Sequence, residues 1–318
     1  MAERTALAAL ANSATSIIMS IAAPIGAPDG TRRLTSRGGA LTLSLDGGGP
    51  WTGAPDAPPS NRFIGNDVMP AEQFRTPPGI EEIDFSGLSR QRLEDMAAAG
   101  EEVMEVHRVL ERTDDNVVGE LIKDAGTFYE WNHYPDGDVY DTDSHSQYYY
   151  HAHPAELRVG EHGHFHTFLR PKGMPRGVKP APIPNLELPD DKDDALSHLI
   201  GISMDSHGIP ICLFTTNRWV TGEVWYRAED IFKMLDIFVI AHAQPSWPVN
   251  RWVGAMIRLF HPQVTALVRL REAVVEEWAK KHPGRDVFED RDLEIASAQP
   301  ISLADQIEKV GRELRKSR

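Results

Sequence analysis

Cysteine is nearly absent from this sequence, which has one, Cys212, among 318 residues. A single thiol excludes an internal disulfide framework and also the zinc or iron–sulfur sites that need several cysteines. Any metal ion would therefore be bound by imidazole and carboxylate groups. Cys212 lies in an apolar run with no basic residue beside it, so we expect a small buried side chain there and not a nucleophile.

Basic residues and long apolar runs are scarce as well. The 33 Lys and Arg stand against 47 Asp and Glu, which gives a formal net charge of −14. Nucleic acids and anionic membranes need a basic surface, so we expect neither as a partner. No run approaches the roughly 20 apolar residues that cross a membrane. Residues 1–27 lack the basic start and long apolar core of a signal peptide, so a cytoplasmic protein is the default expectation.

Composition divides the chain into three parts. Gly, Pro, Ser, Thr and Asp dominate much of residues 1–78, so we expect a disordered, low-complexity leader there. Residues 79–282 are expected to form a single α+β domain, in which an antiparallel sheet of hairpins is packed by helices before and after it. Its proline-rich stretch, residues 171–194, is expected to be a loop packed near the functional site. Residues 283–318 are expected to be a tail with a C-terminal amphipathic helix.

Periodicity places the elements within this outline. Apolar spacing of three and four residues predicts helices over 86–112, 116–123, 228–240, 248–260, 262–280 and 302–315. Aromatic and β-branched content predicts strands over 127–134, 148–153, 161–170, 198–204 and 209–216. Residues 135–138 and 205–208 are typical of turns. His107 falls on the apolar face of the first helix, where we expect a hydrogen-bonded histidine and not a ligand.

Histidines gather between residues 151 and 166, where five of the thirteen lie within sixteen residues. Side chains two apart share one face of a strand, so alternate histidines are expected side by side. If the strands around 148–153 and 161–170 form a hairpin, one register sets His151 opposite His164. The same register sets His153 opposite His162 and Tyr149 opposite His166, and all of these side chains then point to one face.

This face predicts a site for a divalent metal ion, iron(II) or zinc, and with it a possible metalloenzyme. Candidate ligands are His151, His153, His162, His164 and His166. The outer histidines of the second strand lie about 13 Å apart, so two from each strand suit one ion better. The preferred set therefore omits His166. Glu156 or Glu161 could add a carboxylate ligand or act as a general base.

Two alternatives use the same face without a catalytic metal. In one, a metal-free acid–base enzyme uses a histidine near neutral pKa, and Arg218 holds an anionic small-molecule substrate. In the other, a non-catalytic protein binds a ligand or senses a metal in a pocket lined by aromatic residues such as Tyr129, Trp131, Tyr149 and Trp225. The sequence favours a metal without deciding the reaction.

Several motifs together resemble a family of uncharacterised bacterial proteins that share a domain of unknown function. They are Trp131–Pro135, the His-x-His of Tyr150–His153, Glu-His-Gly-His-Phe-His at Glu161–His166, and Thr-Thr-Asn-Arg-Trp-Val-Thr-Gly-Glu at Thr215–Glu223. The resemblance covers about residues 85–280 and implies no particular activity or catalytic residue. A likeness to the first cupin motif fails, because the spacing from His153 to Glu156 is too short and the expected glycines are missing.

Overall fold

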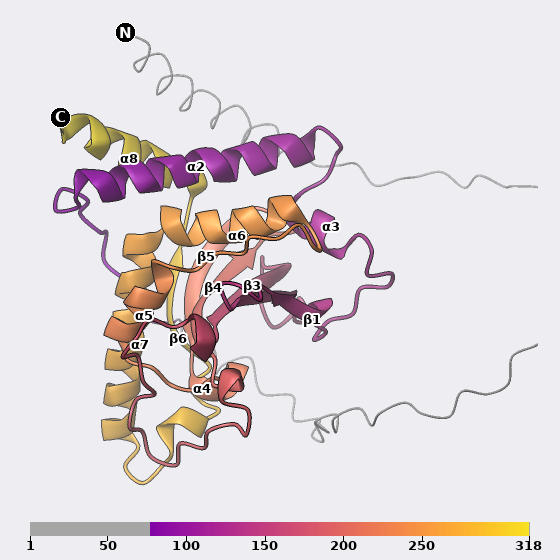
Figure 1. Cartoon of the computed structure of the whole chain (residues 1–318). Helices are drawn as coiled ribbons and strands as arrows, with labels where there is room; N and C mark the ends of the chain where they lie inside the picture. Colours follow the sequence, from indigo (N-terminus) through magenta and orange to yellow (C-terminus); the bar gives the residue numbers. More distant parts are fainter. Residues whose placement is uncertain (1–76, 318) are drawn as a thin grey trace, which may run out of the picture. The chain divides into compact units, whose positions relative to one another are not determined.

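The computed structural model describes residues 77–317 (Figure 1). The leader expected over residues 1–78 therefore lies almost wholly outside the described residues. The predicted fold class is confirmed, since the described part is an antiparallel sheet packed by helices from both ends of the chain. Among these residues, no helix combines the length and the apolar character that crossing a membrane requires.

Six strands form one antiparallel sheet in the order β1-β2-β3-β4-β5-β6, so each strand pairs with the next along the chain. Their bounds are β1 Tyr134–Tyr140, β2 Ser146–His151, β3 Gly163–Leu169, β4 Ser197–Met204, β5 Pro210–Thr216 and β6 Ile295–Pro300. The predicted turn between β4 and β5 is present. The Asp205 carboxylate accepts hydrogen bonds from the backbone N–H groups of His207 and Ile209, and Gly208 adopts a positive φ of 73°.

The first strand differs from its prediction. Residues 127–133 form turns and irregular structure, and β1 instead includes the predicted turn 135–138. Its pairing with β2 shifts between Tyr134 and Val139. Gly137 and Asp138 have positive φ angles of 81° and 60° at that shift. The turn chemistry is therefore present, but it produces an irregularity within an edge strand, where interrupted pairing is tolerated.

The sequence also did not indicate β6. Its residues, Ile-Ala-Ser-Ala-Gln-Pro, are mostly small or polar and show no alternation of large apolar side chains. It nevertheless pairs with β5, from Cys212 opposite Pro300 to Thr216 opposite Ile295. Residues expected to be a tail beyond the domain thus supply the last strand of its sheet.

All the helices except the short Arg218–Thr221, which the sequence did not predict, follow their sequence signals. The helices are α2 Arg90–Glu111, α3 Val117–Ile122, α4 Arg218–Thr221, α5 Ala228–Leu235, α6 Trp247–Leu259, α7 His261–Lys281 and α8 Leu303–Lys316. Side-chain oxygens cap five of them, because hydrogen bonds from backbone N–H groups of the first turn are accepted by Ser89, Asn116, Asn217, Ser246 and Ser302. Such caps satisfy donors that have no partner within the helix.

One face of the sheet packs against these helices, with α2 lying across α6 (Figure 1). Tyr148 donates from its hydroxyl to Asn250 of α6 at 2.6 Å, and the Phe165 ring lies 5.4 Å from that of Trp252. Trp252 in turn donates from Nε1 to Nε2 of buried His107 at 3.1 Å. Because neighbouring residues of a strand alternate, the other face carries Tyr149, His151, His164 and His166.

The proline-rich stretch 171–194 contains two 3-10 helices, Pro171–Gly173 and Lys192–Asp194, and otherwise no regular structure. Ala181 and Ile183 pack in a second, smaller core with Trp225 and Phe288. The β2–β3 connection contacts the histidine face, since Arg158 lies over the ring of Phe214 at 5.5 Å and that ring is 5.1 Å from the ring of His164.

Candidate metal centre

The pairing of β2 with β3 brings the histidines together. His151 lies opposite His164, and Tyr149 lies opposite His166, as the hairpin register predicted. The third expected pair, His153 with His162, is not part of the ladder, because β2 ends at His151 and β3 begins at Gly163. Two of the three predicted pairs are therefore confirmed.

Three imidazoles converge at this end of the hairpin. One ring nitrogen from each of His151, His153 and His164 lies within 4.8 Å of the others. Nε2 of His151 is 2.7 Å from Nε2 of His164, and the His153 ring lies 4.9 Å from that of His151. Imidazole nitrogens gathered in this way are the arrangement that divalent transition metals select.

Glu161 orients one of these rings. Its Oε1 lies 2.6 Å from Nδ1 of His164, so Nδ1 donates and Nε2 keeps its lone pair towards His151. Burial raises the pKa of the Glu161 carboxyl, and the charge of Arg158, whose Nε is 3.9 Å away, opposes that rise. A carboxylate behind a ligating histidine is the usual outer partner in metal sites.

The three imidazoles are uncharged at neutral pH, so each has one ring nitrogen without a proton. Burial, together with neighbouring charge, lowers the pKa of His153 to about 4. Burial also lowers the pKa values of His151 and His164, with adjacent histidines adding to the effect at His151 and the charge of Arg158 at His164. Neutral imidazole is the form that binds a metal ion.

The structure places His162 elsewhere. Its Nδ1 lies 2.6 Å from the hydroxyl of Tyr150, and its ring is 5.6 Å from that of Phe128. Tyr150 faces the helices, so His162 is not beside the other histidines. The backbone explains this, because extended pairing begins only at Gly163. A Cβ there would come within 2.5 Å of the carbonyl oxygen of His151.

His166 lies beside the three converging histidines but has a different partner. Its Nδ1 is 2.9 Å from Nε2 of His198 at the start of β4. The backbone N–H of His198 donates to Glu223 at 2.8 Å, and Glu223 is paired with buried Arg271 at 3.1 Å. A buried series of polar contacts, which runs through His198 and Glu223 to Arg271, therefore supports the His166 ring.

Sequence reasoning assigned no role to several of these residues. His133 stacks on Tyr149 with ring centroids 3.6 Å apart, and its ring lies 5.7 Å from that of His151. His198 stood in a predicted strand and Glu223 in the Thr215–Glu223 motif, but only the tertiary contacts show that they support the histidine face. Arg158 had no sequence signal, because a single arginine in a turn is typical of solvent-exposed surface.

Two predicted catalytic residues lie apart from the converging histidines. Glu156 is exposed on the turn between β2 and β3. Arg218 begins α4, and its guanidinium forms an ion pair with Glu289. The arginine that adjoins the histidine face is Arg158, which is itself paired with Glu294 at 2.7 Å.

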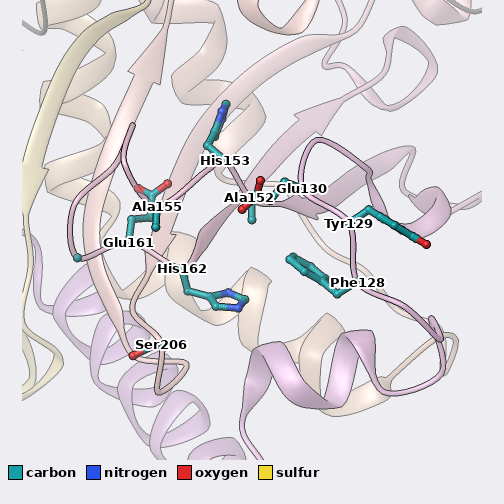
Figure 2. A pocket seen from close by; sticks show the side chains of 10 residues that line it. Phe128, Tyr129, Glu130, Ala152, His153, Ala155, Glu161, His162 and Ser206 are labelled. Atoms are coloured by element: carbon teal, nitrogen blue, oxygen red, sulfur yellow. The ribbon is translucent and has the colours of Figure 1, made fainter. Parts of the chain in front are cut away.

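A pocket of about 630 Å³ borders the centre (Figure 2). His153 and Glu161 contribute to its wall, together with His162 and the segment from Phe128 to Glu130. Figure 2 shows the rings of His162 and Phe128 directed towards one another across the space. Its volume is in the range of small-molecule sites, which are commonly 300–1,000 Å³.

Comparison with known proteins yields a family and no activity. Residues 97–301 match the family described as Domain of unknown function (DUF6969). The match covers most of the chain, so the protein belongs to this family, and the resemblance to a domain of unknown function is confirmed. No curated protein matches the chain, and no solved structure does.

Proposed function

We propose that this member of the DUF6969 family binds one divalent metal ion through His151, His153 and His164. The convergence of their three ring nitrogens within 4.8 Å carries the proposal. The proposed role is that of a metalloenzyme whose ion faces the adjoining pocket. His162, His166, Glu156 and Arg218 are not ligands in this proposal.

The hydrogen bond to Glu161 gives His164 the tautomer that a metal ligand needs. With Nδ1 of His164 donating to Glu161, its Nε2 has only a lone pair to offer to His151. The 2.7 Å contact between the two Nε2 atoms then requires a proton on His151. A cation satisfies both lone pairs at once, and His153 adds a third nitrogen to the same point.

The ligand set favours zinc over iron(II). Three imidazoles with an open fourth position match catalytic zinc sites, whereas non-haem iron(II) sites usually combine two histidines with one carboxylate. Glu161 is the nearest carboxylate, but it is engaged by Nδ1 of His164. Bound zinc would act as a Lewis acid and lower the pKa of a coordinated water.

The metal-free acid–base alternative is less well supported. It required Arg218 to hold an anionic substrate, yet Glu289 already pairs with that guanidinium. His151 and His153 also have lowered pKa values, so at neutral pH they are uncharged and lack the imidazolium proton that a general acid donates.

Elemental analysis of protein purified without an affinity tag tests the proposal. We expect about one equivalent of zinc per chain and its loss in His153→Ala and His164→Ala with the fold retained. His207→Ala is the matched control, because His207 lies in the exposed β4–β5 turn. The proposal fails if wild-type protein, prepared both with and without oxygen, contains neither zinc nor iron and its thermal unfolding is insensitive to chelators.

A further inference from the structure

We propose that the pocket beside the histidine centre binds a small organic amine with an aromatic or apolar body, and that it discriminates against anions. The idea that the amine is a substrate rests on the proposed metal centre. The idea that the amine binds rests on the pocket alone, so amine binding and metal binding can fail separately.

The position of the pocket makes it a substrate site. It shares His153, a proposed ligand, and Glu161, the carboxylate behind a second ligand, with the centre (Figure 2). A molecule in the 630 Å³ space would therefore lie beside the proposed ligand His153. Pockets that adjoin ionisable residues with strongly shifted pKa values are typical of active sites.

Charge at the pocket favours a cation. Glu130 and Glu161 contribute to the wall, and no Lys or Arg does. Asp205 adjoins the lining residue Ser206, and its charge reaches both His162 and Tyr150. Arg158 opposes these charges. It lies 3.9 Å from Glu161, it is paired with Glu294, and its charge also reaches His153. Without a bound metal ion, carboxylates still outnumber cations around the pocket, which attracts an ammonium group and repels a carboxylate or phosphate.

Aromatic rings form part of the remaining wall, beside small residues such as Ala152 and Ala155. Phe128 stacks on Tyr134 at 4.7 Å, which fixes its ring at the pocket. Tyr129 and the neighbouring Trp131 are unusually exposed for aromatic side chains, at 60% and 57%. Trp131 also lies 4.4 Å from the ring of His153. Such rings can contact an apolar body and attract an ammonium group through their faces.

Three probes of one shape separate charge from size: benzylamine, benzyl alcohol and benzoate. Binding to the full chain is measured by titration calorimetry, both as purified and after chelation. The measurement on chelated protein excludes binding of benzoate through direct coordination to a metal ion. We expect benzylamine to bind best and benzoate at least about ten-fold more weakly, as repulsion by the surrounding carboxylates requires.

Two pairs of variants locate the binding. Glu130→Gln should weaken benzylamine by about two- to five-fold, the scale of one exposed ion pair, and leave benzyl alcohol unchanged. Glu276→Gln removes an exposed carboxylate from α7 and should change neither probe. Ser206→Trp should obstruct the pocket and weaken all probes, whereas His207→Trp, in the same turn, should not.

Each outcome decides the question. Benzoate binding as well as benzylamine to chelated protein, or benzylamine binding unaffected by both Glu130→Gln and Ser206→Trp, overturns the proposal. An absence of binding by all three probes overturns it too. Benzylamine selectivity in a wild-type protein that contains no metal supports the pocket and refutes the metal centre alone.

Discussion

Glu161 and His164 are joined by a 2.6 Å hydrogen bond between the carboxylate and Nδ1. The two residues are three apart in the sequence but belong to different local structures, since Glu161 ends the β2–β3 turn and His164 lies in β3. The bond selects the tautomer of His164 and directs its Nε2 at His151. It therefore links the turn to the convergence of the three imidazoles.

Replacing Glu161 should lower the affinity for the metal ion without abolishing its binding. Glu161→Gln keeps an oxygen that can accept from His164 but removes the negative charge, and loss of such an outer partner typically costs about 10–100-fold in metal affinity. Zinc affinity is measured by competition with a chromophoric chelator, and Glu276→Gln is the control. An affinity equal to that of wild type would show that the carboxylate does not tune the site.

Replacing His162, in contrast, should leave metal binding unchanged. His162→Ala should retain one equivalent of metal, because its imidazole contacts Tyr150 and not the converging histidines. Loss of that hydrogen bond should reduce the free energy of unfolding by about 1 kcal/mol. Elemental analysis and urea unfolding measure the two effects. Metal loss with an intact fold would restore His162 to the ligand set that the sequence predicted.

Acid should destabilise the protein partly through His107. Burial lowers the pKa of His107 to about 4, whereas in the unfolded chain a histidine has an ordinary value near 6.5. The unfolded chain therefore takes up the proton first. The neutral ring contributes stability that is fully present above pH 6.5 and is lost as the pH falls towards 4, by about 3 kcal/mol.

His107→Gln isolates this contribution, because glutamine keeps an acceptor for Nε1 of Trp252 but does not titrate. Urea midpoints at pH 7 and pH 4.5 are compared with those of wild type. The other buried histidines act in the same direction, so both proteins should lose stability in acid, and the variant should lose less. Equal losses in the two proteins would contradict the prediction.

Breaking the buried ion pair of Glu223 and Arg271 should make the free energy of unfolding depend on pH. Arg271→Met leaves a buried carboxylate without its partner, which typically costs about 3–5 kcal/mol. Burial already raises the pKa of Glu223 to about 7, and loss of the cation should raise it further. The carboxyl can then bind a proton at pH 6, so we expect a smaller loss of unfolding free energy at pH 6 than at pH 8.

The double variant Arg271→Met, Glu223→Gln is the control for this pair. Its stability should exceed that of Arg271→Met at pH 8 and should vary less between the two pH values. A loss in Arg271→Met that is equal at pH 6 and pH 8 would show that Glu223 does not take up the proton.

Local sequence determined most of the elements because their signals lie within a few residues. Ser89, Asn116 and Ser302 cap helices that apolar spacing predicted. Alternation placed Tyr149 with His151, and His164 with His166, on one face of each strand, and Asp205 with Gly208 marked the β4–β5 turn. These features depend on backbone preferences and on the period of a strand or helix, which the chain carries in every short segment.

Tertiary structure decided the membership of the site, because contacts between distant segments set it. Alternation alone would have kept His162 with His164, but extended pairing starts only at Gly163, and Tyr150 binds the displaced ring. Arg218 is paired with Glu289, which lies 71 residues further along the chain. The sequence thus determined that histidines gather on one face, and long-range pairing decided that three of them converge.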